Sequence, residues 1–451
     1  MTRFVTVNRD TAYLLPPSVE DWLPKDHLAR FVVDIVDQLN LSGLTRQYRG
    51  TGSDAYHPAM MLGLLIYGYA TGVYSSRRIE AGTYESIAFR YIAANTHPDH
   101  DSLCTFRKRF LKEIEALFVQ VLGIARQMKL LKLGTIALDG TKIHANASRH
   151  SALSYGHAQK LEAQLEAEVK ELLARAEAAD SEPLPEGLSI PTELSRREER
   201  LAAIRQAKAQ IEARAAERDA QEKAEFDAKM KAREEKVART GKKPGGKPPA
   251  PPSGGVRPTD QANLTDPDSR IMPAKGEGFD QSYNAQAAVD ADSMLIVATG
   301  MAQVATDKQQ IEPMLEALAA LPEELGSIEH LLADNGFFSA ANVERCVEAK
   351  IEPLLAAGRD GHHPHWQDRF TEPPALAEPA SAVERMKHRL KTLQGRKLYG
   401  LRKHTVEPVF GIIKSVMGFR QFLLRGLAAV RGEWSLVTMA WNIKRMAVMA
   451  G

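Results

Sequence analysis

The stretch Leu-Gly-Thr-Ile-Ala-Leu-Asp-Gly-Thr-Lys-Ile-His-Ala-Asn at residues 133–146 decides the fold. A short apolar run leads to Asp139, and Gly140 follows it, which predicts a buried strand that ends in an acid. The stretch His-Leu-Leu-Ala-Asp-Asn-Gly at 330–336 repeats the pattern with Asp334. A carboxylate in this position is costly unless it is paired or binds a cation. The alternative for each acid is an ordinary turn or helix cap.

Strands and helices alternate around these two stretches. Residues 283–289 and 294–298 predict a β-hairpin, and residues 351–357 predict a further strand. Asp307 is expected to cap the helix that carries Ile311. The order strand, hairpin, helix, strand, helix, strand, helix predicts a mixed α/β fold.

The first 130 residues predict an all-helical domain. Its longest apolar run, Pro58 to Val73, has 16 residues and three glycines. A membrane span needs about 20 residues, so we expect a buried helix and no membrane partner. A polar turn at 95–100 precedes a predicted helix with Phe106 on its apolar face and several basic residues. A basic helix after a polar turn is typical of helix-turn-helix DNA binding. The alternative is an ordinary helical bundle, in which such turns are common. Three residues of this helix are expected to contact DNA: Arg107, Lys108 and Arg109.

The composition changes twice in the middle of the chain. Residues 155–238 are rich in Ala, Glu, Lys and Arg and carry apolar residues at helical spacing, which predicts a coiled-coil-like helical hairpin. Residues 239–260 are rich in Gly and Pro and predict a linker. The expected domains are a helical DNA-binding domain at 1–130, the first part of the core at 131–154, the hairpin at 155–238, the linker at 239–260 and the rest of the core at 261–451.

The net charge of +2 conceals an asymmetry. Residues 389–451 contain 12 Lys and Arg against 2 Asp and Glu, whereas the rest of the chain has a net charge of −8. A basic segment on an acidic protein indicates a polyanion held locally, and a solvated basic helix is the equal alternative. With 44% apolar and 26% charged residues, wholesale disorder, collagen and a disulfide scaffold are excluded. Two cysteines and no leader predict a cytoplasmic protein.

A third acid, Glu407, lies in a helical stretch among apolar residues such as Val406 and Val409. Together with Asp139 and Asp334 it would form a hard oxygen site suited to Mg²⁺. Two such ions can activate a nucleophile and stabilise the leaving oxygen of a phosphodiester. The alternative is a helix with one exposed ion pair. Three basic residues near Glu407 are expected to hold phosphate: Arg402, Lys403 and Lys414.

The three acidic motifs together carry a family resemblance. They read Ile-Ala-Leu-Asp139-Gly-Thr-Lys-Ile, Leu-Leu-Ala-Asp334-Asn-Gly-Phe-Phe and Arg-Lys-His-Thr-Val-Glu407-Pro-Val-Phe-Gly-Ile-Ile-Lys414. In this order they resemble the motifs of insertion-sequence DDE transposases. The resemblance implies a helical DNA-binding region followed by a ribonuclease-H-like core that the hairpin interrupts. It also implies that Asp139, Asp334 and Glu407 are catalytic ligands of two Mg²⁺ ions, with Mn²⁺ as an alternative.

Many relatives carry a Tyr-x2-Arg-x3-Glu-x6-Lys pattern around the third acid. Two residues separate Tyr399 from Arg402 and six separate Glu407 from Lys414, as the pattern expects. Four residues separate Arg402 from Glu407, however, whereas Lys403 has the expected three. The basic role therefore falls on either residue. The resemblance implies double-stranded DNA as partner, both element ends and target, a homodimer or higher oligomer on DNA, and a place in the bacterial cytoplasm at the nucleoid.

Two other classes of function compete with an active transposase. One is a domesticated or degenerate relative that binds DNA without cutting it, which the presence of all three acids disfavours. The other is an unrelated hydrolase with paired carboxylates, such as a phosphatase, which the basic C-terminal segment and the helix-turn-helix pattern disfavour.

Overall fold

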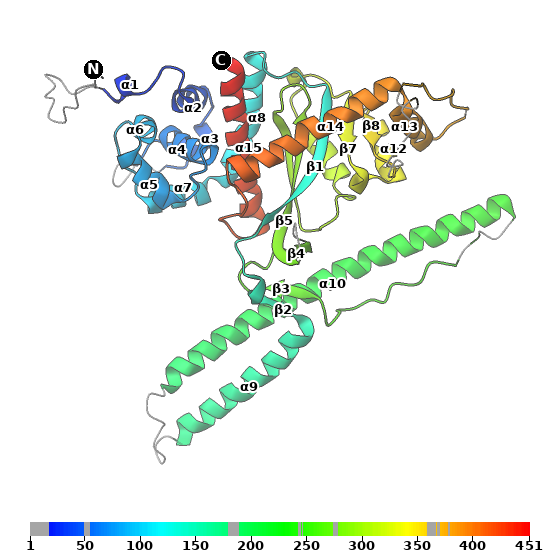
Figure 1. Cartoon of the computed structure of the whole chain (residues 1–451). Helices are drawn as coiled ribbons and strands as arrows, with labels where there is room; N and C mark the ends of the chain where they lie inside the picture. Colours follow the sequence, from blue (N-terminus) through cyan, green and yellow to red (C-terminus); the bar gives the residue numbers. More distant parts are fainter. Residues whose placement is uncertain are drawn as a thin grey trace, which may run out of the picture. The chain divides into compact units, whose positions relative to one another are not determined.

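The structure is a computed structural model that describes residues 18–48, 55–178, 189–241, 245, 247–273, 278–358, 367, 370–377 and 379–451. The chain divides into two compact units (Figure 1). Unit 1 comprises Met1–Ile143 with Asn284–Gly451, and unit 2 comprises His144–Tyr283. Within the described residues, no helix is both long and apolar enough to cross a membrane.

The N-terminal part of unit 1 is helical, as expected. Its helices are α1 (Val19–Trp22), α2 (Leu28–Asp37), α3 (Ser42–Thr45), α4 (Pro58–Ala70), α5 (Ser76–Glu85), α6 (Ile87–Ile92), α7 (His100–Arg109) and α8 (Leu111–Gln127). The apolar run becomes α4, with Pro58 in its first turn and His57 as its cap. Helix α4 is buried almost all round because it packs against α2 and the C-terminal helix α15 (Leu427–Ala450).

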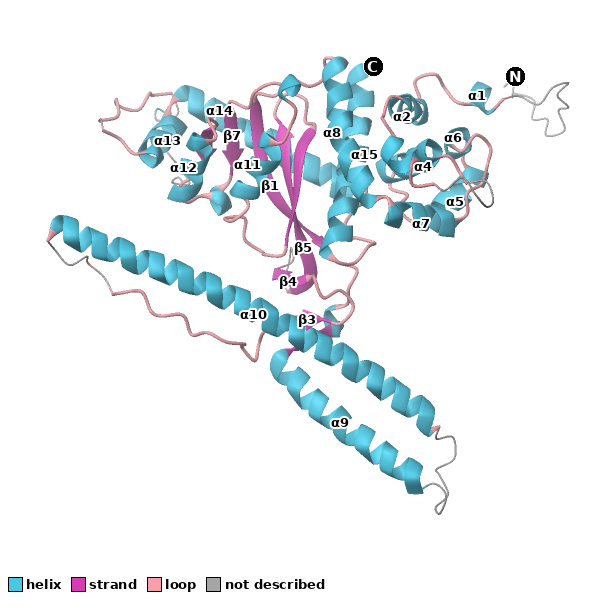
Figure 2. Cartoon of the chain, turned by 180° about the vertical axis from the view of Figure 1, so that it is seen from behind, coloured by secondary structure: helices cyan, strands magenta, loops and turns pink. Residues whose placement is uncertain are grey.

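The mixed α/β class is confirmed by a sheet (Figure 2). Its strands are β1 (Thr135–His144), β4 (Arg270–Pro273), β5 (Phe279–Asp290), β6 (Ile296–Ala302), β7 (His330–Ala333) and β8 (Glu352–Leu355). Within the described residues the order is β4-β5-β1-β7-β8, with β6 also paired to β5. Strands β1, β7 and β8 run parallel to one another, and β5 and β6 form the predicted antiparallel hairpin.

Five helices of unit 1 follow or cover this sheet: α11 (Ile311–Ala319), α12 (Ala340–Glu348), α13 (Ala382–Lys391), α14 (Leu393–Gly411) and α15. Helix α14 crosses the face seen in Figure 1, and α11 lies on the face seen in Figure 2. Helix α15 is pinned to the β5–β6 hairpin by side chains. Trp434 Nε1 donates to the Gln286 carbonyl at 3.0 Å, and Asn442 makes two hydrogen bonds with the backbone of Ile296.

Unit 2 holds the stretch that was expected to form a hairpin. Helix α9 (Tyr155–Ala178) runs beside the first part of α10 (Ile190–Thr240), and ion pairs such as Arg197–Glu168 and Arg205–Glu166 join them. Strands β2 (Ala152–Ser154) and β3 (Gln261–Asn263) pair at the base of α9. The described part of the Gly/Pro-rich segment returns along the second part of α10, where Arg218 donates to the Gly255 carbonyl at 3.0 Å.

A buried polar network joins the N-terminal helices of unit 1 to α15. Glu433 is fully buried on α15 and accepts hydrogen bonds from the Tyr69 hydroxyl at 2.8 Å and from the backbone amides of Leu423 and Leu424. The Tyr69 hydroxyl in turn accepts from Arg107 Nη1 at 3.0 Å. Burial raises the pKa of Glu433, and its hydrogen bonds and the nearby Arg107 partly offset this. These bonds pair the carboxylate, the hydroxyl and one guanidinium nitrogen with one another, whereas Arg107 Nε is buried without a partner among the described residues.

Replacing Tyr69 by Phe should lower the free energy of unfolding by about 1–3 kcal/mol, because Glu433 and Arg107 would each lose a buried partner. The measurement is urea unfolding followed by the fluorescence of Trp434 and Trp441, which lie on α15. Tyr84→Phe is the matched control, because the Tyr84 ring is largely exposed. Equal stability of Tyr69→Phe and Tyr84→Phe would contradict the role of the network.

Candidate active site

The register of β1 and β7 brings the first two predicted acids together. Leu138 pairs with Ala333 in parallel, so Asp139 and Asp334 are the next residues on the two adjacent strands. Asp334 caps a short 3₁₀ turn that begins at Asn335, and its side chain accepts the Gly336 amide at 2.8 Å. Strand β1 continues past Asp139 to His144, so the prediction that this strand ends at Asp139 is wrong, whereas Asp334 does follow the last residue of β7. The parallel register still places the two acids at neighbouring positions, level with the carboxyl end of β7.

The third predicted acid joins them through an arginine. Glu407 lies on α14, and Arg402 Nη2 lies 2.9 Å from Glu407 Oε1. Arg402 Nη1 lies 3.8 Å from Asp139 Oδ2, and the Arg402 side chain is only 13% exposed. One guanidinium therefore contacts both the strand acid and the helix acid. Helix α14 supplies it from the side that packs on the core, because Val406 and Val409, four and seven residues after Arg402 and so on the same face, are buried.

The sequence left the choice between Arg402 and Lys403 open, and the structure separates them. Lys403 is exposed, although it lies four residues before Glu407, the usual same-face spacing in a helix. Lys414 follows α14 in a single π-helical turn, and its Nζ donates to the Lys142 carbonyl of β1 at 2.7 Å. Tyr399 is half-buried, and burial raises the pKa of its hydroxyl, with Arg402 nearby opposing the rise.

A fourth acid lies at this edge, and sequence reasoning gave it another role. Asp307 was expected to cap a helix, but α11 begins at Ile311 with Gln310 as its cap, so that prediction is wrong. Asp307 Oδ1 instead accepts the side-chain amides of Asn284 at 2.8 Å and Gln286 at 2.7 Å. Both amides are buried on β5. Two amides at alternate positions among the Ala and Val residues of 284–289 were the available signal, because buried polar groups need partners.

Two glycines show how closely Asp307 approaches the other acids. A Cβ added to Gly140 would overlap Asp307 Oδ1 and Gln286 Nε2, and a Cβ on Gly336 would lie 2.9 Å from Asp334 Oδ1 and 3.6 Å from Asp307 Oδ2. Gly140 follows Asp139 directly, so the Asp307 carboxylate lies next to both strand acids. Only a residue without a side chain fits at Gly140.

The environment of Asp139 opposes its ionisation. Burial is the main cause that raises the pKa of Asp139 to about 7, and the carboxylates of Asp334 and Asp307 raise it further. The Gly140 amide and Arg402 act in the opposite direction. A buried carboxyl with carboxylate neighbours is the setting in which an added cation is most favourable.

The donor chemistry of this edge fits a hard divalent cation. The side chains offer only carboxylate oxygens, which Mg²⁺ and Mn²⁺ prefer, and the neighbouring acids leave excess negative charge around Asp139. Among the described residues, no group of three His, Cys, Asp or Glu is arranged to hold a metal ion. Arg402 is the cation that contacts Asp139 and Glu407 in this structure.

The basic residues predicted on α7 have three different environments. Arg107 is buried, with its Nη1 bonded to the Tyr69 hydroxyl and the Tyr74 carbonyl, so its position favours packing over DNA contact. Lys108 is exposed. Arg109 is also exposed, donates to the Gln47 carbonyl at 2.6 Å and lies over the Tyr48 ring.

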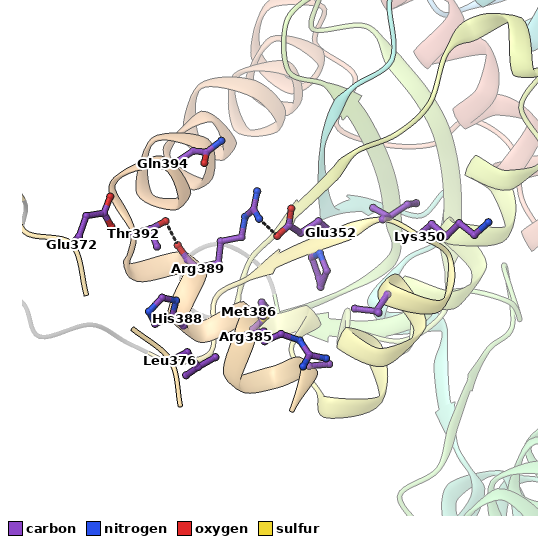
Figure 3. Close-up of a pocket in the computed structure, with 14 residues that line it drawn as sticks. Lys350, Glu352, Glu372, Leu376, Arg385, Met386, His388, Arg389, Thr392 and Gln394 are labelled. Carbon is purple, nitrogen blue, oxygen red and sulfur yellow. Dashed lines mark hydrogen bonds and ion pairs between the residues drawn. The ribbon is translucent and has the colours of Figure 1, made fainter. Parts of the chain in front are cut away.

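The largest cavity described in unit 1 lies at the other end of the parallel strands (Figure 3). It measures about 790 Å³ and is lined in part by Lys350, Glu352 and Arg389. Glu352 begins β8, whereas Asp334 follows the end of β7 and Asp139 lies level with it on β1. Arg389 forms an ion pair with Glu352, as Figure 3 shows, so the strongest charges of this cavity neutralise each other.

Two parts of the chain match known transposase families. Residues 17–109 match the family described as transposase domain (DUF772), and residues 259–443 match the family described as transposase DDE domain. Both matches are to transposase families and support the resemblance of the motifs to those of insertion-sequence DDE transposases. The mixed sheet with a helical N-terminal region is consistent with the ribonuclease-H-like DDE fold. No curated protein and no solved structure matches the chain.

The matched ranges do not cover all predicted site residues. Asp334, Arg402, Glu407 and Lys414 lie within the DDE match, whereas Asp139 lies outside both matched ranges. The place of Asp139 beside them comes from the pairing of β1 with β7 and from its contact with Arg402.

Gly140→Ala should lower the free energy of unfolding by about 1–3 kcal/mol, because the new methyl group would overlap the Asp307 carboxylate and the Gln286 amide. Gly134→Ala is the matched control, because Gly134 immediately precedes the same strand and a Cβ there would meet nothing within 4 Å. That control should be neutral or gain up to about 1 kcal/mol. Urea unfolding measures both, and an unchanged Gly140→Ala would show that the carboxylates are not packed against β1.

Proposed function

We propose that the chain is an active DNA transposase that cuts the ends of a mobile element and joins them to target DNA by metal-dependent phosphoryl transfer. The observation that carries this proposal is the contact of Arg402 with both Asp139 and Glu407, at the strand edge where Asp334 follows β7. It unites residues from three distant parts of the chain in one acidic site. A solitary turn aspartate or a surface ion pair would not require this convergence.

In this proposal Asp139, Asp334 and Glu407 are the catalytic acids and hold two Mg²⁺ ions, with Mn²⁺ as an alternative. Bound ions would supply an activated oxygen nucleophile and charge stabilisation at the scissile phosphorus. Asp307 would orient the edge, because two buried amides fix one of its oxygens. Its proximity to Asp139 and Asp334 adds to the negative charge that favours a divalent cation.

The proposed reaction has two in-line displacements at phosphorus. In the first, the oxygen of water attacks and the bond to the 3′ oxygen breaks, which frees a 3′-hydroxyl at the element end. In the second, that hydroxyl attacks a target phosphodiester and displaces its 3′ oxygen. Arg402 and Lys414 would hold phosphate oxygens during both steps, and exposed Lys403 would contact the DNA backbone outside the acids.

The proposed partners are double-stranded DNA at element ends and at the target, with a homodimer or higher oligomer forming on DNA. We assign end binding to the helical domain at 1–130, where exposed Lys108 and Arg109 are the available cations of α7. The core at 131–154 and 261–451 would carry the chemistry, with the hairpin at 155–238 and the linker at 239–260 inserted between its parts. The proposed location is the bacterial cytoplasm, at the nucleoid.

Asp139→Asn, Asp334→Asn and Glu407→Gln should each reduce cleavage of a labelled element end in Mg²⁺ by about a hundredfold or more, because each change removes a ligand charge. The substrate is identified by searching the DNA that flanks the gene for inverted repeats. Binding of the same DNA in EDTA should persist, which separates loss of chemistry from loss of folding.

Glu348→Gln is the control for these three variants, because Glu348 is an exposed acid at the end of α12. Its cleavage should equal that of the unmodified chain. Near-normal cleavage by any of the three site variants would remove that residue from the site. End binding without cleavage by the unmodified chain would instead support a DNA-binding relative that has lost the chemistry.

Arg402→Ala should lower single-turnover cleavage by about a hundredfold, because Asp139 and Glu407 would lose their shared cation. Lys403→Ala, the matched control one residue away, should change the rate by no more than about threefold, since an exposed cation contributes little. Arg402→Lys should recover only part of the activity, because an ammonium cannot form the same fork. A larger loss in Lys403→Ala than in Arg402→Ala would exchange the two roles.

A further inference from the structure

Unit 2 contains a cavity of its own, of about 430 Å³, between α10 and strands β3 and β4. Its charged lining consists of three arginines and one aspartate: Arg214, Arg218, Arg270 and Asp260. The charges of these side chains sum to +2, so this cavity is electropositive within a chain whose overall charge is close to neutral.

One of the three arginines is neutralised. Arg218 Nη1 and Nη2 donate to the two oxygens of Asp260, at 2.9 and 3.1 Å. The Asp260 carboxylate is held further by the Arg257 amide at 2.9 Å. This bidentate pair leaves Arg214 and Arg270 as the charges that the cavity does not balance.

Arg214 and Arg270 are positioned by neutral acceptors. Arg214 donates to the carbonyls of Gln210 and Gln261, both at 3.1 Å, and Arg270 Nη1 donates to three carbonyls at 2.8–2.9 Å in the turn before β4. Within the described part of the chain, no carboxylate lies within 4.0 Å of either guanidinium. Carbonyls fix an arginine without cancelling its charge.

The two guanidiniums repel each other. Burial lowers the pKa of Arg270 to about 10, and the charge of Arg214 lowers it further, against the opposing charges of Asp268 and Asp266. Burial also lowers the pKa of Arg214, against the opposing charges of Asp260 and Asp268. No hydrogen bond within the described residues uses Nη1 of Arg214 or Nη2 of Arg270. Two fixed like charges with unused donors in one cavity are stabilised by an anion that accepts from both.

The larger cavity of unit 1 is less basic. Three cations line it, Lys350, Arg385 and Arg389, against two acids, Glu352 and Glu372. Arg389 is ion-paired with Glu352, as Figure 3 shows.

We propose that the cavity between α10 and strands β3 and β4 binds a phosphate of the DNA backbone through Arg214 and Arg270. The proposal rests on the proposed function, because transposition is what brings DNA to this chain. Backbone phosphates carry no sequence information, so this contact adds affinity for any duplex and leaves the reading of element ends to other residues. The insertion is then a second DNA-holding part of the enzyme.

The test measures binding of the full chain to a labelled random-sequence duplex of about 20 bp, in EDTA, across a salt series. Arg214→Gln, Arg270→Gln and the double variant are compared with Arg239→Gln. That control makes the same charge change on an exposed part of α10, about 37 Å further along the helix. Circular dichroism and thermal unfolding confirm that each variant is folded.

Loss of one phosphate contact should weaken binding about fivefold at ~0.15 M salt and flatten the slope of log affinity against log salt by about 0.9. Because both arginines hold one phosphate, the double variant should lose about the same slope as either single variant. Arg239→Gln should leave affinity and slope unchanged. Unchanged binding by the folded double variant would overturn the proposal.

A second arm uses inorganic phosphate alone, which should raise the thermal midpoint of the unmodified chain but not of the double variant. Phosphate stabilisation combined with unchanged duplex affinity would identify a small-anion site and overturn the DNA assignment. Cleavage is not measured in either arm. Near-normal cleavage by the Asp139, Asp334 and Glu407 variants would therefore overturn the proposed function without changing the binding result. Unchanged DNA binding by the arginine double variant would overturn the phosphate site without changing the cleavage result.

Discussion

The parallel pairing of β1 with β7 is the constraint on which the rest of the site depends. Its register places Asp139, within β1, level with Asp334, which follows the last residue of β7. Two carboxylates side by side in a partly buried place repel each other, so the fold around them must supply positive charge or donors. Arg402 from α14 supplies charge to Asp139, and backbone amides supply donors to both. Even with Arg402 nearby, burial and the neighbouring carboxylates raise the pKa of Asp139 to about 7.

Helix α15 connects the sheet that carries these acids to the N-terminal helices of unit 1. It holds β5 through Trp434 and thereby fixes the strand whose amides bind Asp307. On its other side Glu433 reaches Tyr69 of α4, which also accepts from Arg107 of α7. A lone buried carboxylate would cost several kcal/mol, roughly 3–5 if its partner were removed. The N-terminal helices and the sheet that carries the acids therefore both pack against α15 and belong to one folded unit.

The sequence predicts what depends on local pattern and misses what depends on contacts between distant segments. The strands that carry or precede Asp139 and Asp334 and the buried helix at Pro58 follow from short apolar runs, but these runs do not show that β1 continues past Asp139 to His144. Asp307 was misassigned because its partners lie more than 20 residues earlier, on β5. Arg107 was assigned to DNA because helical spacing cannot show which cation of a basic run faces Tyr69. The long side chain of Arg402 contacts both Glu407, five residues later, and Asp139 on β1. The second contact joins distant segments, so the spacing within α14 could not show it.

The fate of the basic C-terminal segment follows from how its cations are held. A cation paired with a carboxylate is neutralised, whereas a cation bonded to a carbonyl is fixed and keeps its charge. Lys444 donates to the Ala70 carbonyl and Arg445 to the Ser293 carbonyl, and no carboxylate in the described part of the chain lies within ion-pair distance of either. Packing therefore orders these two cations without a carboxylate partner, although burial lowers the pKa of Lys444. Other cations of the segment are paired, Arg389 with Glu352 and Arg402 with Asp139 and Glu407. Arg214 and Arg270 of unit 2 are held in the same way as Lys444 and Arg445. In both units, then, some cations donate to backbone carbonyls and have no carboxylate partner among the described residues. Cations held in this way keep their charge, which a polyanion requires.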